Sequence, residues 1–228
     1  METFRGEVLI LPRSKDWKLI DETDTFSKKQ RLKCKEKYGR ECLLYPFPAG
    51  MQVLEIFKPT RWLDPTAGWG DRLRCAIKYG CTYTGVDSNK SMQPAYKAII
   101  QHYIPQLFAK YRKNYTVMYG KFQDAVIEGK FDLVFTSPPF FNKEVYEGMV
   151  EWKNVEHFFE EFLKPLLCKS FKHLEKDGHI VLYIEDMPDA EFIDMMKLFV
   201  KDEIPQLTYQ GAFYYQGSKP RPYYVWKY

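Results

Sequence analysis

Short apolar runs, rich in β-branched and aromatic residues, alternate with longer helix-like segments from about Leu63 onward. This alternation is typical of a parallel sheet whose strands are connected by helices that cover its faces. The strands expected from it are residues 61–63, 82–86, 115–119, 131–136 and 179–184. The helices expected are residues 72–79, 91–111, 155–174 and 189–200, the last beginning at Asp189 after a proline.

The last part of the chain has a different pattern. Residues 207–216 and 223–228 are rich in Tyr, Phe and Val, and the segment between them is too short for a helix. Such a pair is predicted to form an antiparallel hairpin. The fold class that follows is α/β, with a seven-stranded, mostly parallel sheet and a C-terminal antiparallel hairpin.

Residues 1–45 lack the alternation of strands and helices that the rest of the chain shows, and they are predicted to be a basic N-terminal extension. Residues 46–228 are predicted to form one domain. The extension holds a short strand candidate at residues 8–11 and a segment rich in lysine and arginine. Lys and Arg bind phosphates without regard to sequence, so Lys28, Lys29 and Arg31 are candidate contacts to a polyanion. A solvated helix face is the other interpretation of this charge run.

Composition narrows the class of protein. The net charge of +4 permits a polyanionic partner without requiring one. Five widely spaced cysteines predict neither a disulfide framework nor a zinc site, and the four histidines lack metal-ligand spacing. Neither a signal-peptide pattern nor an apolar stretch long enough to cross a bilayer is found. We therefore expect a soluble intracellular protein, cytoplasmic or nuclear, with no membrane and no metal partner.

A glycine-containing loop joins the first strand of the alternating region to the first helix. It consists of Asp64, Pro65, Thr66, Ala67, Gly68, Trp69, Gly70 and Asp71. Glycines at this place let the backbone turn tightly and approach a ligand. Asp87 and Ser88 end the next strand, where a carboxylate typically accepts hydrogen bonds from ribose hydroxyls. A dinucleotide-binding loop has three spaced glycines and no preceding Asp-Pro, so a nicotinamide or flavin cofactor is disfavoured.

A second turn, Ser137-Pro138-Pro139-Phe140, follows the expected strand at residues 131–136. Proline fixes φ and lacks a backbone donor, so the pair ends the strand in a stiff turn whose carbonyls can accept hydrogen bonds. The hydroxyl before this turn and the aromatic ring after it fit a planar, hydrogen-bonding group such as a nucleobase. A proline turn with a core phenylalanine is the alternative that the segment itself leaves open.

The glycine loop, Asp87 and the Ser-Pro-Pro-Phe turn together resemble the motifs of S-adenosylmethionine-dependent methyltransferases that act on exocyclic amino groups of nucleobases, over residues 45–228. The resemblance implies a Rossmann-like methyltransferase fold and S-adenosylmethionine as the cofactor. It also implies that the glycine loop lies against the methionine part, that Asp87 and Ser88 bind the ribose, and that Asp124 contacts the adenine amino group. A segment before the loop folds back over the cofactor in that family, and Phe47 is its equivalent here.

The same resemblance assigns catalysis to Ser137, Pro138, Pro139 and Phe140. An exocyclic amino nitrogen is a poor nucleophile because its lone pair is delocalised into the ring. Hydrogen bonds from its two protons to the Ser137 hydroxyl and the Pro138 carbonyl would favour a pyramidal nitrogen, so positioning supplies much of the acceleration. Phe140 would stack on the base, a contact worth about 1–3 kcal/mol in nucleic-acid sites.

The substrate that these motifs predict is nucleic acid, DNA rather than RNA, with adenine and cytosine both open. Residues after the turn are expected to form a lid over the target, with Phe141, Tyr146 and Trp152 as aromatic contacts. No separate target-recognition domain fits before the next helix, so a homodimer or a partner subunit stays open as a source of selectivity. RNA or a protein glutamine as substrate, and a non-catalytic nucleic-acid-binding subunit, are the alternatives.

Overall fold

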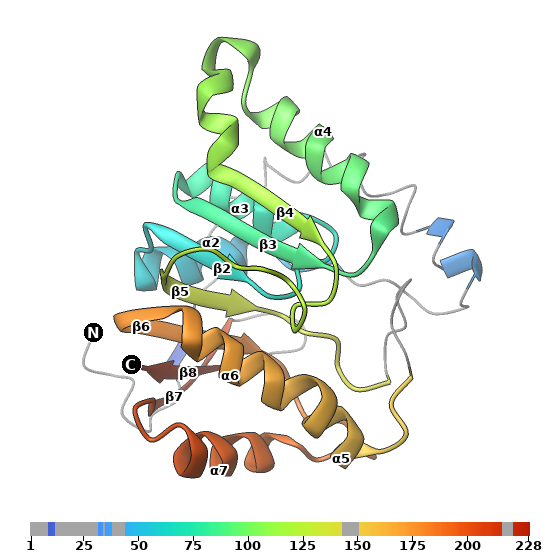
Figure 1. Cartoon of the computed structure of the whole chain (residues 1–228), viewed down its shortest axis with the longest axis vertical. Helices are drawn as coiled ribbons and strands as arrows, with labels where there is room; N and C mark the ends of the chain where they lie inside the picture. The colour runs from blue at the N-terminus through green and yellow to red at the C-terminus, as the bar shows by residue number, and fades with distance from the viewer. Residues whose placement is uncertain (1–8, 12–31, 34, 38–43, 143–150, 216–220) are drawn as a thin grey trace.

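The computed structural model describes residues 9–11, 32–33, 35–37, 44–142, 151–215 and 221–228. In this part of the chain one sheet is covered by helices on both faces (Figure 1). The strands are β1 (Leu9–Leu11), β2 (Arg61–Asp64), β3 (Thr82–Asp87), β4 (Tyr115–Tyr119), β5 (Phe131–Thr136), β6 (Leu174–Tyr183), β7 (Thr208–Tyr215) and β8 (Pro222–Lys227). The α-helices are α2 (Phe47–Phe57), α3 (Asp71–Tyr79), α4 (Gln93–Tyr103), α5 (Val155–Phe158), α6 (Lys164–His173) and α7 (Ile193–Glu203). Two 3₁₀ segments, η2 (Lys90–Met92) and η3 (Gln106–Asn114), and one π-helical turn, η4 (Phe159–Leu163), complete the list.

The strands follow the order β1-β7-β8-β6-β5-β2-β3-β4. All seven strands predicted for the sheet are present, which confirms the α/β fold class. The strand candidate at residues 8–11 is confirmed as well, because β1 pairs in parallel with β7. The predicted hairpin is also confirmed, because β7 and β8 are antiparallel neighbours. Its second strand, β8, lies between β6 and β7 and runs against both.

Two hydrophobic cores form because consecutive side chains of a strand point to opposite faces of the sheet. In β2, Trp62 enters the core beneath α2, α3 and α4, whereas Leu63 enters the core beneath α5, α6 and α7. Phe135 and Val134 of β5 divide in the same way. The central strands are therefore buried on both faces, as the near-continuous apolar run at residues 131–136 predicted.

The long helix expected at residues 91–111 is interrupted, which corrects that prediction. Helix α4 ends at Tyr103, and the chain continues as the 3₁₀ segment η3 after Pro105. A proline disfavours the α conformation in the residue before it, and Ile104 is accordingly extended, with φ −117° and ψ 91°. Apolar spacing on both sides of the break concealed it in the sequence.

The last helix starts later than expected, at Ile193 rather than at Asp189. Asp186 caps it, since its Oδ1 accepts hydrogen bonds from the backbone N–H groups of Phe192 at 2.7 Å and Ile193 at 2.9 Å. A carboxylate that accepts from the first free N–H groups of a helix stabilises its start. The capping acid thus lies three residues after the end of β6.

Candidate active site

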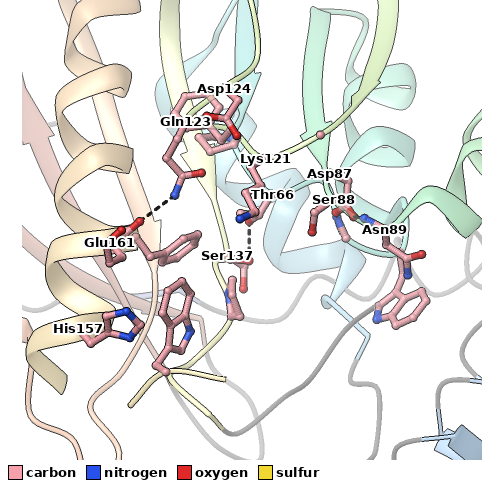
Figure 2. Close-up of a pocket in the computed structure, with 18 residues that line it drawn as sticks. Thr66, Asp87, Ser88, Asn89, Lys121, Gln123, Asp124, Ser137, His157 and Glu161 are labelled. Carbon is pink, nitrogen blue, oxygen red and sulfur yellow. Dashed lines mark hydrogen bonds between the residues drawn. The ribbon is translucent and has the colours of Figure 1, made fainter. Parts of the chain in front are cut away.

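A cavity of about 430 Å³ lies where strands β2, β3 and β5 end. Figure 2 shows Ser137 beside Thr66, with Asp87, Ser88 and Asn89 on one side and His157 and Glu161 on the other. The residues that line it are Pro65, Thr66, Gly68, Trp69, Asp87, Ser88, Asn89, Gly120, Lys121, Phe122, Gln123, Asp124, Ser137, Pro139, Trp152, His157, Glu161 and Phe162. Both sequence motifs therefore meet in one cavity at the edge of the sheet where open α/β folds place their ligands.

The glycine loop has the backbone shape that only glycine adopts without strain. Gly68 and Gly70 have φ values of +63° and +90°. At Gly70 a Cβ atom would also lie 2.5 Å from Cδ1 of Ile99 in α4, so the loop packs directly on that helix. The carbonyl of Gly68 accepts a hydrogen bond from the Tyr96 hydroxyl at 2.5 Å. Packing on Ile99 and the hydrogen bond from Tyr96 thus fix the position of the loop relative to α4.

Asp87 lies at the cavity wall, as the sequence predicted for this acid. Its Oδ2 accepts a hydrogen bond from Gly68 N at 2.7 Å, and its Oδ1 accepts one from Asn89 N at 2.8 Å. Burial raises the pKa of Asp87 to about 6, although these two bonds act in the opposite direction. A carboxylate offers about four lone-pair sites, so two remain for hydroxyl groups of a ligand.

Asp124 also lines the cavity, in the loop that follows β4. Lys169 of α6 fixes this loop from below, because its ammonium group donates to the carbonyls of Phe122, Gln123 and Ala125 at 2.6, 2.9 and 2.6 Å. Burial lowers the pKa of Lys169. The loop thus holds Asp124 at the cavity wall, where Figure 2 shows it beside Gln123 and apart from Asp87.

Asp64 does not line the cavity, which corrects its assignment to cofactor contact. It is fully buried, and its Oδ2 accepts from Arg72 Nε at 2.8 Å and from the Tyr83 hydroxyl at 2.6 Å. Although burial alone would lower the pKa of Arg72, the Asp64 carboxylate raises it. Arg72 also donates to the carbonyl of Thr66. The first residue of the motif therefore holds the glycine loop from inside the protein.

Four further residues predicted from the resemblance lie away from the cavity wall. Phe47 is buried in α2, where Arg74 lies over its ring, so it does not cover the cavity. Ala67 and Gly70 are buried within the glycine loop, and Asp71 is buried at the start of α3. These four residues are not among those that line the cavity.

The proline turn is divided between the cavity and the core. Ser137 and Pro139 line the cavity, whereas Pro138 and Phe140 are buried and do not. The Phe140 ring is 3% exposed, and the guanidinium of Arg221 lies 4.7 Å from its centroid. Arg221 in turn pairs with Glu185 at 2.9 Å. The core phenylalanine that the sequence left open is thus what the structure shows, and this position argues against stacking of Phe140 on a base.

Among the described residues predicted as aromatic contacts after the turn, Trp152 lines the cavity. Asn142 fixes it with two hydrogen bonds, from Asn142 Nδ2 to Trp152 O at 2.7 Å and from Trp152 N to Asn142 Oδ1 at 2.8 Å. The rings of Phe158 and Phe162 support the indole at centroid distances of 5.5 and 5.7 Å. Its Nε1 is buried and has no hydrogen-bond partner within the described residues. The Trp152 ring is therefore held at the cavity wall, while its N–H is buried.

Some predicted contacts are not cavity residues or lie outside the described part. Phe141 packs edge-on against Phe158 at a centroid distance of 5.8 Å and does not line the cavity. Tyr146, Lys28, Lys29 and Arg31 lie outside the described residues.

Sequence reasoning missed several cavity residues, among them Asn89, Gln123, His157 and Glu161. Asn89 and Gln123 could have been predicted from their positions, since Asn89 lies two residues after Asp87 and Gln123 directly precedes Asp124. His157 and Glu161 carried no such signal. Their spacing of four residues places them on one side of a helix, but the sequence does not show that this side faces the cavity. Within the described residues there is no cluster of three or more metal-ligating side chains, and none of the helices there is long and apolar enough to span a membrane.

No protein-family model matches the chain, and no curated protein matches it either. Solved structures match its fold at low sequence identity. Glycopeptide N-methyltransferase MtfA is 12% identical over 79% of this chain and 94% of that one, with a TM-score of 0.56. N-methyltransferase NodS from Bradyrhizobium japonicum is 11% identical over 78% and 93%, with a TM-score of 0.55. The chain has the class I methyltransferase fold.

A third structure with this methyltransferase fold comes from Listeria monocytogenes and is described as a class I S-adenosylmethionine-dependent methyltransferase. It is 12% identical over 93% of this chain and 70% of that one, with a TM-score of 0.53. In the complex of MtfA with sinefungin, the match spans 65% of this chain and 53% of that one, with a TM-score of 0.48. The class I methyltransferase fold agrees with the Rossmann-like methyltransferase fold that the motifs predicted.

Proposed function

We propose that the chain is an S-adenosylmethionine-dependent methyltransferase that acts on an exocyclic amino group of a nucleobase, with DNA as the expected polymer. The observation that carries the proposal is the cavity at the ends of β2, β3 and β5. Gly68 and Asp87, which are predicted to bind the cofactor, line the same cavity as Ser137 of the proline turn. The preference for DNA rests on the resemblance of the motifs, because the net charge of +4 permits a polyanionic substrate but does not distinguish DNA from RNA.

The residues present fit the proposed cofactor. The Asp87 carboxylate has two lone-pair sites left for ribose hydroxyls, and the Asp124 carboxylate is an acceptor for an adenine amino group. Thr66, Gly68 and Trp69 supply the third side of the cavity, where the methionine part belongs. When bound, the sulfonium of S-adenosylmethionine supplies an electrophilic methyl group.

The side chains at the other side of the cavity position the acceptor. The Ser137 hydroxyl oxygen accepts a hydrogen bond from the amino group, which holds the nitrogen lone pair in line for attack. The Trp152 ring lines the cavity and is the aromatic surface that Phe140, buried beneath the turn, does not offer. Extrusion of a base from a duplex costs a few kcal/mol, roughly, which these contacts have to offset.

Incubation of the full chain with methyl-labelled cofactor and separate pools of DNA, RNA and protein tests the proposal. Mass spectrometry of the nucleosides is expected to show N6-methyladenine or N4-methylcytosine from DNA. Label in RNA or in glutamine would replace the expected substrate, and label in no pool would overturn the proposed function.

Ser137→Ala tests the role of the turn. Loss of a hydrogen bond to the reacting group is expected to lower turnover by about 10- to 100-fold, while cofactor binding measured by calorimetry stays unchanged. The matched control is Ser170→Ala, which removes a buried hydroxyl of α6 outside the cavity. Equal turnover of the two variants would contradict the assigned role.

A further inference from the structure

Hydroxyl groups connect the glycine loop with the proline turn beneath the cavity. Asp64 and Thr136 end the paired strands β2 and β5, and both are fully buried. Thr136 Oγ1 donates to Asp64 Oδ1 at 2.7 Å. Thr66 Oγ1 lies 2.6 Å from Thr136 Oγ1 and donates to the carbonyl oxygen of Ser137 at 3.0 Å (Figure 2). A continuous chain of hydrogen bonds therefore runs from the first motif to the backbone of the second.

Counting protons gives these bonds a direction. A carboxylate only accepts hydrogen bonds, so Thr136 gives its single hydroxyl proton to Asp64. The Thr136 oxygen is then an acceptor, which Thr66 N reaches at 3.2 Å. The Thr66 hydroxyl has one proton and two acceptors within reach, Thr136 Oγ1 and the Ser137 carbonyl. The position of the glycine loop relative to the turn sets the geometry of both contacts.

Thr66 is exposed to the cavity at the same time. It lines the wall next to Gly68, and its carbonyl accepts a hydrogen bond from Arg72. Ser137 follows Thr136 directly and also lines the cavity. Since the following residue is proline, the backbone at Ser137 is stiff, and a change at its carbonyl moves the turn as a unit.

We propose that Thr66 and Thr136 are positioning residues that couple the cofactor loop to the acceptor turn, so that a ligand on the loop sets the position of Ser137. This inference rests on the proposed function, because it requires that the cofactor occupy the loop. The coupling gives the site an order: the acceptor turn takes its final position after the cofactor has bound. Asp64 serves as the fixed end of the chain, since Arg72 and Tyr83 hold its other oxygen.

Two variants interrupt the chain at different points without a change in side-chain volume. Thr66→Val removes the donor to the Ser137 carbonyl, and Thr136→Val removes the donor to Asp64 together with the acceptor for Thr66. Thr66→Ser and Thr136→Ser keep the hydroxyl and are expected to retain the coupling. Thr84→Val is the matched control, because Thr84 is a half-buried strand residue outside this chain of hydrogen bonds.

Hydrogen exchange with and without S-adenosylhomocysteine measures the coupling independently of the methyl acceptor. In the wild type the ligand is expected to protect both residues 64–71 and residues 131–137. In the two valine variants, protection of residues 131–137 is expected to fall by about 3- to 10-fold, the equivalent of one hydrogen bond, while residues 64–71 stay protected. The serine variants and Thr84→Val are expected to match the wild type.

The outcomes separate this inference from the proposed function. If the ligand protects residues 64–71 but the valine variants keep full protection of residues 131–137, the coupling is wrong and the proposed function stands. If the ligand protects neither segment in the wild type, the proposed function fails and the coupling fails with it. With an identified acceptor, Thr136→Val, whose side chain does not line the cavity, is expected to lower kcat and leave cofactor affinity unchanged, a split that a loss of folding would not produce.

Discussion

The buried ion pair between Asp64 and Arg72 gives the sharpest prediction about stability. Asp64 is fully buried and Arg72 is 4% exposed, and two hydrogen bonds at 2.8 and 3.2 Å join them. Asp64→Asn preserves the shape of the side chain but leaves the Arg72 guanidinium without its counter-charge. Removal of one partner of a buried pair costs about 3–5 kcal/mol. A chain of this length loses about 2–4 °C in Tm per kcal/mol, so a decrease of about 6–20 °C is expected.

Thermal unfolding followed by circular dichroism measures this decrease. The control is Glu175→Gln, which breaks the surface pair with Arg61, whose N–O distance is 3.7 Å and whose side chains are 44% and 43% exposed. An exposed pair contributes at most about 1 kcal/mol, so the control is expected to lose less than about 4 °C. Equal decreases in the two variants would refute the argument from burial.

A double variant separates the lost charge from the lost contacts. Arg72→Met removes the guanidinium that Asp64→Asn leaves unpaired. The combined variant is therefore expected to be less destabilised than the sum of its two single variants. Strict additivity would show that Asp64 and Arg72 do not stabilise each other.

Three further predictions concern the cavity and its supports. Burial raises the pKa of Asp87 to about 6, so this carboxyl takes up a proton as the pH falls through 6. The protonated carboxyl is a weaker acceptor for ribose hydroxyls, and the affinity for S-adenosylhomocysteine, measured by calorimetry, is expected to decrease from pH 7.5 to pH 5. The same affinity at all three of pH 5, 6 and 7.5 would exclude Asp87 from ligand binding. Phe140→Ala is expected to cost about 3–5 kcal/mol of folding stability. Trp152→Ala is expected to raise KM for the acceptor and to cost less stability than Phe140→Ala, because Trp152 is only partly buried; the reverse pattern would show that Phe140 stacks on the substrate. Gly70→Ala combines a positive φ with a contact to Ile99 and is expected to destabilise the chain by more than about 1 kcal/mol in urea unfolding, and a neutral effect would show that the loop adapts.

Much of the fold was predictable because its signals are local. The apolar run of β5 and the patterns around it define strands and helices through side-chain periodicity, which neighbouring residues alone determine. The interruption after α4 was not predicted, although Pro105 was visible, since the apolar spacing continued past it. The start of α7 at Ile193 depended on Asp186, a capping acid seven residues away.

The candidate site was predictable in part for a similar reason. Loops after successive parallel strands meet at one edge of the sheet, so the sequence order of Gly68, Asp87, Asp124 and Ser137 was enough to bring them together. The arrangement of side chains within a loop was not predictable from type alone. Phe140 has the aromatic ring that a stacking contact requires, yet its ring packs beneath Arg221, more than 80 positions further along the chain.

The sequence by itself therefore determined the order of strands and helices and the loops that carry polar groups to the edge of the sheet. Tertiary structure alone decided which of those groups face the cavity and which support it. Asp64 shows the physical reason: its carboxylate is surrounded by donors from Arg72, Tyr83 and Thr136, which lie 8, 19 and 72 positions away. Burial of a charge becomes favourable only when such partners converge, and no local pattern records that convergence.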